Sequence, residues 1–261
     1  MMMTRDENSK RMQQDIRDIS EYVMDRYGMT RIIEFLFGRN QGSRTHPISD
    51  ANERYCIIDC STSMTDTVEG DNKFSRGLML SLIIERIARK SGLTMDFACI
   101  TDEYQHKVSG SDPTSMLGHI RTREGISSTS WSTISEHIEK EVRPDTPIMI
   151  ISDFMFDPNA RIVAEITATG RIVNALQVLD DIDEDIPERL DRIIIKSPGS
   201  ENAARVKIEK SKQEYKLLTK EYNQYLKEMF THPHTGFFSV RTSDDPEKNM
   251  IELLTQARVI V

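Results

Sequence analysis

The feature that most constrains this chain is a short apolar run that ends at an aspartate, Tyr-Cys-Ile-Ile-Asp at residues 55–59. Such a run suits a central strand of a parallel sheet, because both faces of that strand are covered. The carboxyl end of the strand then faces the ligand crevice of an open α/β sheet. We therefore expect Asp59, Ser61 and Ser63 to lie together on the loop above a buried strand.

A second apolar run, Pro-Ile-Met-Ile-Ile-Ser at residues 147–152, also ends at an aspartate, Asp153. Parallel strands end at one edge of their sheet, so both carboxylates are expected there. Around these runs, strand-like and helical patterns alternate. Further strands are predicted at 94–100, 107–108, 171–179, 192–196 and 237–241, and helices at 74–90, 111–122, 133–141, 158–169, 201–230 and 246–258. The alternation predicts the α/β class, with a doubly wound, mostly parallel sheet and helices on both faces.

The first part of the chain has a different pattern, and we divide the chain into an N-terminal helical arm with linker (1–52) and one α/β domain (53–261). Apolar residues recur at helical spacing over 8–27, which predicts an amphipathic helix. Residues 32–37 form a second helix or a strand, and a polar stretch follows. We expect the apolar stripe of the first helix to lie on its own domain, with docking to another protein as the alternative.

Charge and composition limit the partners and the compartment. The formal net charge is −8, which makes nucleic acid and anionic membranes poor partners. Cys56, Cys60 and Cys99 fall in or beside apolar runs without metal-finger spacing, and they predict buried, reduced thiols. No apolar run approaches the roughly 18 residues that a membrane helix needs, and the first residues lack the apolar core of a signal peptide. We expect a cytoplasmic protein.

The candidate site offers hard oxygen ligands. Carboxylate and hydroxyl oxygens suit Mg²⁺ or Mn²⁺ and do not suit zinc or copper. Besides the two strand-end runs, the hydroxyl-rich stretch 125–133 (Gly-Ile-Ser-Ser-Thr-Ser-Trp-Ser-Thr) supplies a further hydroxyl from a third loop. These three loops can converge at the carboxyl edge of the sheet.

This combination resembles the von Willebrand factor A domain with its metal-ion-dependent adhesion site. In that family an Asp-x-Ser-x-Ser motif, a loop threonine and a distant strand-end aspartate hold one divalent cation, usually Mg²⁺. One coordination position stays open for an acidic residue of a partner protein. The resemblance implies a metal site made of Asp59, Ser61, Ser63, Thr129 and Asp153.

The loop hydroxyl has three candidates. The family often has a Gly-Gly-Thr loop, whereas this chain has Gly-Ile-Ser-Ser-Thr at 125–129. We assign Thr129, with Ser127 and Ser128 as alternatives. Trp131 follows closely and is expected to contact the docked partner, although a lone tryptophan also commonly fills a core.

Further short matches point to a subfamily. The sequences Ile-Ile-Ser-Asp-Phe at 150–154, Asp-Pro at 157–158, Gln-Val-Leu-Asp at 177–180 and Ile-Pro at 186–187 look like the bacterial subfamily encoded beside MoxR-type AAA+ ATPases. The resemblance implies an adaptor for such an ATPase. The acidic segment 180–185 lacks the glycine and closing glutamate of a calcium loop, so we expect an exposed acidic turn there.

Enzymatic alternatives fit less well. The main alternative is a Mg²⁺-dependent phosphotransfer enzyme with Asp59 as nucleophile. Such sites need a second aspartate two residues later, and this chain has Ser61 there. The sequence contains no Gly-x-Ser-x-Gly elbow and no Gly-x-x-x-x-Gly-Lys loop. We predict a non-enzymatic, metal-dependent protein-binding module.

Overall fold

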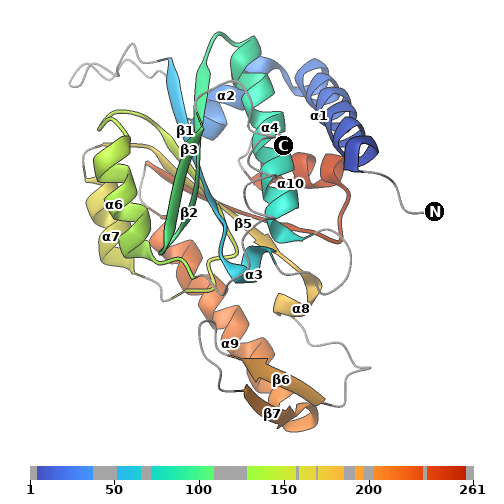
Figure 1. Ribbon diagram of the computed structural model, residues 1–261. Coiled ribbons are helices and arrows are strands. Elements are labelled where there is room, and N and C mark those ends of the chain that lie inside the picture. The colour runs from blue at the N-terminus through green and yellow to red at the C-terminus, as the bar shows by residue number, and fades with distance from the viewer. Residues whose placement is uncertain are drawn as a thin grey trace.

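A six-stranded sheet forms the centre of the computed structural model (Figure 1). Its strands lie in the order β3-β2-β1-β4-β5-β8. The structure describes residues 5–37, 52–65, 72–108, 128–156, 159–168, 170–184, 192–196, 203–231 and 234–256. The strands are β1 (Glu53–Asp59), β2 (Thr94–Thr101), β3 (Tyr104–Val108), β4 (Ile148–Ser152), β5 (Val173–Leu179) and β8 (Thr235–Arg241). A separate antiparallel pair joins β6 (Arg192–Lys196) to β7 (Ala203–Lys207).

The order in which the chain adds strands to the sheet reverses at β1. Strand β1 pairs in parallel with both β2 and β4, β4 pairs in parallel with β5, and β5 with β8. The edge strand β3 is antiparallel to β2. The chain thus adds β2 on one side of β1 and then β4 on the other, so the topological switch point lies between β1 and β4. This is where an open α/β sheet binds its ligand.

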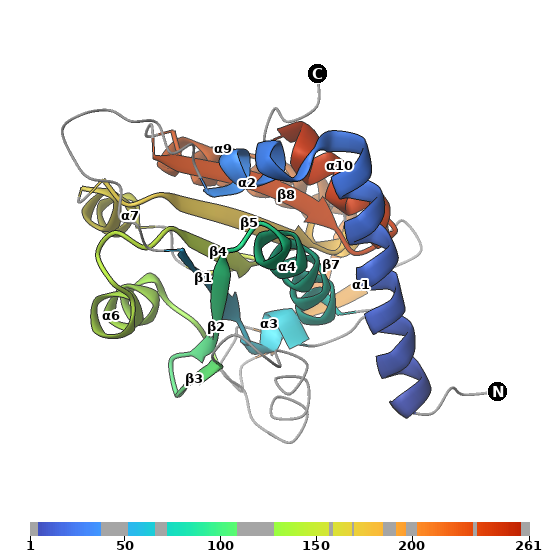
Figure 2. The ribbon, with the colours of Figure 1, turned by 90° about the horizontal axis from the view of Figure 1, so that it is seen from above.

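Helices cover both faces of the sheet, as Figure 2 shows from above. One face is covered by α1 (Arg5–Tyr27), α2 (Met29–Phe37), α4 (Lys73–Lys90) and α10 (Pro246–Gln256), and the other by α6 (Trp131–Glu141), α7 (Ala160–Thr167) and α9 (Ile208–Met229). The short helices α3 (Thr62–Thr65) and α8 (Asp181–Glu184) follow β1 and β5. The doubly wound α/β class expected from the sequence is confirmed.

The N-terminal helices share the core of the sheet. Ile19 and Val23 of α1 and Leu36 and Phe37 of α2 are buried in the same apolar cluster as α4 and α10. On the surface, Glu21 of α1 forms an ion pair of 3.0 Å with Arg86 of α4. The apolar stripe of α1 is therefore covered by helices of its own chain.

Helix α4 packs closely against the sheet at Gly77. Asn72 caps its first turn, because its side-chain oxygen accepts a hydrogen bond of 2.7 Å from the backbone N–H of Ser75. At Gly77 the helix faces β4, and a Cβ atom there would lie 2.7 Å from Cγ2 of Ile151. The missing side chain lets the first turns of α4, with Lys73, approach the carboxyl end of β4.

Two segments differ from the sequence-based expectation. The helix expected from residue 201 begins at Ile208, because 203–207 form strand β7. The expected strand 192–196 is present, but it pairs with β7 outside the main sheet. Pairing with an apolar strand here overrides the helical propensity of the Ala-Ala-Arg-Val-Lys sequence. The expected helix 111–122 lies outside the described residues.

No helix in the described part of the chain is long and apolar enough to span a membrane.

The close approach at Gly77 can be tested by substitution. We expect Gly77→Ala to lower the free energy of unfolding by about 1–3 kcal/mol, because the added methyl group must displace the β-branched Ile151 in a packed core. Alanine has the higher helix propensity, so a change on the helix alone would stabilise the protein. Urea unfolding measures the difference, with the exposed Arg89→Ala in the same helix as a near-neutral control. Unfolding of Gly77→Ala at higher urea than wild type would contradict the close packing.

Candidate metal-binding site

Asp59 connects three loops at the switch point. It is the last residue of β1 and its side chain is buried, with 1% of the residue exposed. Its Oδ1 accepts hydrogen bonds from the backbone N–H of Ser61 (2.8 Å) and from Oγ1 of Thr129 (2.6 Å). Its Oδ2 accepts one from Oγ of Ser152 (2.6 Å). The loops after β1 and β4 and the loop before α6 therefore meet at one carboxylate.

The hydroxyls of Ser61 and Ser63 lie together beside Asp59. Their Oγ atoms are 3.1 Å apart. The chain turns sharply here, because the carbonyl of Ser61 accepts hydrogen bonds from the backbone N–H groups of Met64 and Thr65 at the start of α3. Ser61 is buried and Ser63 is half-buried, so Ser63 is the more accessible of these two hydroxyl residues.

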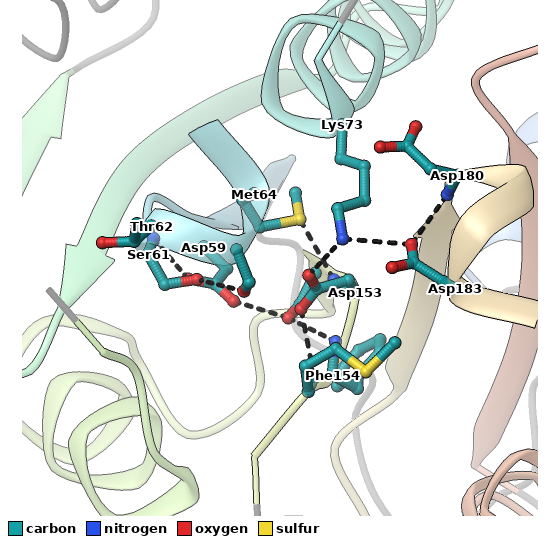
Figure 3. Close-up of polar contacts among 12 residues, drawn as sticks. Asp59, Ser61, Thr62, Met64, Lys73, Asp153, Phe154, Asp180 and Asp183 are labelled. Atoms are coloured by element: carbon teal, nitrogen blue, oxygen red, sulfur yellow. Dashed lines mark hydrogen bonds and ion pairs between the residues drawn. The ribbon is translucent and has the colours of Figure 1, made fainter. Parts of the chain in front are cut away.

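Asp153 lies directly after β4 and is fully buried. Its Oδ1 accepts a hydrogen bond of 3.0 Å from the backbone N–H of Met155, and its Oδ2 accepts one of 2.7 Å from Nζ of Lys73. Its own backbone N–H donates to Sδ of Met64 at 3.1 Å, which ties the loop after β4 to α3. Both strand-end carboxylates are thus fixed by groups from other elements (Figure 3).

The backbone after Asp153 is held in an unusual conformation. Phe154 has φ = 57°, in the left-handed region that a bulky side chain rarely adopts. Its N–H donates to Oγ of Ser152 at 2.8 Å. The hydroxyl of Tyr222, on α9, donates to the carbonyl oxygens of Phe154 and of Phe156, the latter at 2.7 Å. These contacts keep the loop folded around the buried carboxylate.

Thr129 is the hydroxyl that the structure places at Asp59, and Ser128 points elsewhere. Ser128 donates to Oδ2 of Asp102 at 2.7 Å, while Ser127 lies outside the described residues. Ser130 also donates to Asp102, at 3.0 Å, as does Thr133. Burial raises the pKa of Asp102, but these hydroxyl hydrogen bonds lower it by more. The pKa of Asp102 is therefore below its ordinary value.

Asp102 is a site residue that the sequence reasoning missed. Its backbone N–H donates to the carbonyl of Ser128 at 2.8 Å, so backbone and side chain together anchor the loop that carries Thr129. The available signal was its position, since Asp102 directly follows strand β2 and so resembles Asp59 and Asp153 in placement.

The two central carboxylates repel each other. Burial, and then the charge of Asp153, raise the pKa of Asp59 to about 6, against the opposing hydrogen bonds from Ser152, Thr129 and Ser61. Asp59 has no ion-pair partner among the residues that the structure describes. A buried carboxylate without a counter-ion is costly, and a bound cation would offset that cost.

Lys73 supplies one positive charge to the site. Its Nζ lies 2.7 Å from Oδ2 of Asp153 and 3.0 Å from Oδ2 of Asp183, and its side chain is 5% exposed (Figure 3). Burial lowers the pKa of Lys73, but the charges of Asp153 and Asp183 raise it more, so the ammonium stays protonated. The prediction of an exposed acidic turn around 180–185 is therefore wrong for Asp183, because α8 directs this side chain to Lys73.

Trp131 also differs from the expectation. Its residue is 2% exposed, and its ring stacks on Phe154 at 5.8 Å between centroids and meets the edge of Phe156 at 5.6 Å. The assignment of Trp131 as a partner contact is corrected: it fills the core beneath the site. Burial of its large apolar surface in this aromatic cluster is more favourable than exposure of that surface to water.

The donor set fits a hard divalent cation. The oxygen donors are two carboxylates and three hydroxyls, from Asp59, Ser61, Ser63, Thr129 and Asp153. No group of three or more His, Cys, Asp or Glu side chains with metal-binding geometry occurs within the described ranges. Oxygen ligands with few charges suit Mg²⁺ or Mn²⁺ and not the softer transition metals.

Comparison with known proteins yields structural likeness only. No protein-family model and no curated protein matches the chain. Among solved structures, it is similar to an aerotolerance-related membrane protein from Bacteroides fragilis (13% identity, TM-score 0.43, covering 80% of this chain and 99% of that one). It is similar to the conserved hypothetical protein BatB from Bacteroides thetaiotaomicron (13%, 0.43, 79% and 98%) and to the SpRpn10 VWA domain (9%, 0.43, 76% and 93%). The assignment of the site therefore rests on the residues of this chain.

The raised pKa of Asp59 predicts a stability effect in metal-free protein. The pKa of Asp59 is 3.8 in the unfolded chain and about 6 in the native state, so the native state binds this proton more readily. Ionisation of Asp59 therefore destabilises the fold as the pH rises from about 4 to 6. A shift of this size corresponds to about 3 kcal/mol. With EDTA present, we expect Asp59→Asn to unfold at higher urea than wild type at pH 8, with a smaller difference at pH 4.5. A variant less stable than wild type at pH 8 would contradict this.

The anchoring role of Asp102 predicts faster hydrogen exchange. We expect Asp102→Ala to raise amide exchange over residues 128–133 by about tenfold, since loss of several hydrogen bonds costs of the order of 1 kcal/mol or more locally. The neighbouring exposed Glu103→Ala serves as control. Unchanged exchange in Asp102→Ala would mean that the loop is held by other contacts.

Proposed function

We propose that this protein is a non-enzymatic, divalent-metal-dependent protein-binding module. Asp59, Ser61, Ser63, Thr129 and Asp153 would hold one Mg²⁺ or Mn²⁺, and an acidic residue of a partner protein would complete the shell. The observation that carries the proposal is the hydrogen bond of 2.6 Å between Thr129 and Asp59. It joins residues 70 positions apart at the switch point, where the ligands expected from the sequence would have to converge.

The contacts of Asp59 favour binding over catalysis. Its described contacts are the hydroxyls of Thr129 and Ser152 and the amide of Ser61. A phosphotransfer site needs an acid–base group beside its nucleophile, and a serine hydroxyl is a poor substitute. Hydroxyls that hold a carboxylate in place suit a site that keeps one ion in a fixed position.

The choice of an acidic partner follows from the charge of the proposed ligands. Three of the five donors are neutral hydroxyls, so a bound divalent cation keeps much of its positive field toward solvent. A partner's Asp or Glu would gain an interaction there that water does not supply. Among partners, we propose an AAA+ ATPase of the MoxR type, on the strength of the sequence matches at 150–158 and 177–187.

The proposal is tested by metal binding and by capture of partners. Asp59→Ala and Asp153→Ala should abolish Mn²⁺ binding in calorimetry, and Ser61→Ala should weaken it less, because water can replace one hydroxyl. The exposed Asp145→Ala is the control. Pull-downs from the native host should recover a partner with Mg²⁺ and lose it in EDTA or with Asp59→Ala.

Two results would overturn this function. Equal recovery of the partner with and without EDTA would place recognition elsewhere on the protein. Steady Mg²⁺-dependent hydrolysis of phosphate esters that Asp59→Ala removes would restore the phosphotransfer alternative.

A further inference from the structure

Lys73 occupies a position that a cation would normally avoid. It is the first residue of α4, directly after the cap residue Asn72. The positive end of the helix dipole disfavours a cation there, and burial of an ammonium group adds a second cost. The compensation comes from outside the helix, from Asp153 and Asp183 at 2.7 and 3.0 Å. These two ion pairs therefore stabilise the charged Lys73 side chain in its buried position.

Asp183 is held independently of Lys73. Its Oδ2 accepts a hydrogen bond of 2.8 Å from the backbone N–H of Asp180. The hydroxyl of Tyr215, on α9, donates to the carbonyl oxygens of Ile182 (3.3 Å) and of Asp183 (3.1 Å), which fixes the turn of α8. The second acceptor of the ammonium is thus fixed by other contacts, whereas Asp153 belongs to the proposed metal ligands.

The charges of this cluster are unbalanced without a further cation. Asp59, Asp153 and Asp183 contribute three carboxylates when ionised, and Lys73 contributes one ammonium. The sum is −2, which one divalent cation would neutralise if Lys73 stayed in the cluster. An ammonium that remained on Asp153 would instead repel the cation from one of its ligands.

We propose that Lys73 is an internal counter-ion that controls metal occupancy: it neutralises Asp153 in the metal-free protein, and it leaves Asp153 and stays on Asp183 when a divalent cation binds. This inference rests on the proposed function and adds its regulation. Asp183 promotes metal binding without being a ligand, because it gives the displaced ammonium a partner. Lys73 opposes binding, because its contact with Asp153 must break first.

Four proteins test the inference: wild type, Lys73→Met, Asp183→Asn and the double variant, each titrated with Mn²⁺ while EPR reports the free ion. An opposite charge in contact changes an ionic equilibrium by 1 to 3 powers of ten. Lys73→Met should bind Mn²⁺ about tenfold or more tightly than wild type, and Asp183→Asn about tenfold less tightly. The exposed Lys90→Met, in the last turn of the same helix, is the control.

The double variant separates this mechanism from simple attraction through space. If Asp183 acts through Lys73, then Asp183→Asn should change the affinity of Lys73→Met by about threefold or less. An undiminished tenfold loss in the Lys73→Met background would overturn the transfer of Lys73 to Asp183.

The remaining outcomes distinguish the inference from the function on which it rests. Equal Mn²⁺ affinity of wild type and Lys73→Met, with binding that Asp59→Ala abolishes, overturns the inference and leaves the function intact. Absence of Asp59-dependent binding in all four proteins overturns both.

A measurement on the wild-type protein tests the inference even if Lys73→Met fails to fold. In the ¹⁵N-labelled wild-type protein, Mg²⁺ should shift the side-chain ammonium signal of Lys73, and that signal should keep its protection from exchange on Asp183. An ammonium signal unchanged at saturating Mg²⁺ would overturn the inference.

Discussion

The repulsion between two buried carboxylates is the constraint on which the site depends. Asp59 is the last residue of β1 and Asp153 directly follows β4, and the pairing of these adjacent parallel strands keeps the two carboxylates near each other. Everything around them reduces the resulting cost: hydroxyl and amide donors at Asp59, and the ammonium of Lys73 at Asp153. Apolar side chains at these positions would avoid that cost, so the retained charges support the proposed function.

The fold brings the compensating groups to this point by backbone packing. Gly77 lets α4 approach β4, and this approach positions the capped first turn of the helix with Lys73 above the strand ends. On the other face, Trp131 and Phe154 stack beneath the loops and exclude water from below. The charged groups are consequently buried from both sides and interact more strongly than they would at an open surface.

The sequence predicts the fold class and much of the site because these depend on local patterns. The runs at 55–59 and 147–153 each predict a buried strand with a carboxylate at its end. The topology of the sheet then determines where the two carboxylates meet. Lys73 and Asp183 escaped prediction, because their roles depend on neighbours far along the chain, and nothing near Lys73 in sequence marks it as buried. Trp131 was misjudged for the same reason, since its aromatic neighbours come from other elements. Strand β7 could not be foreseen, because only its pairing with β6 opposes its helical propensity.

Helix α9 connects the two loops on either side of Lys73. Tyr215 bonds to α8 and Tyr222 bonds to the loop after β4, and these residues are seven positions apart, about two turns along one face of the helix. Both α8 and the loop after β4 are thus bonded to one helix. The amino-terminal end of this helix directly follows β7 of the β6–β7 hairpin. A displacement of α9 at its β7 end would therefore reach α8 and the loop after β4 together, because both are bonded to this one helix.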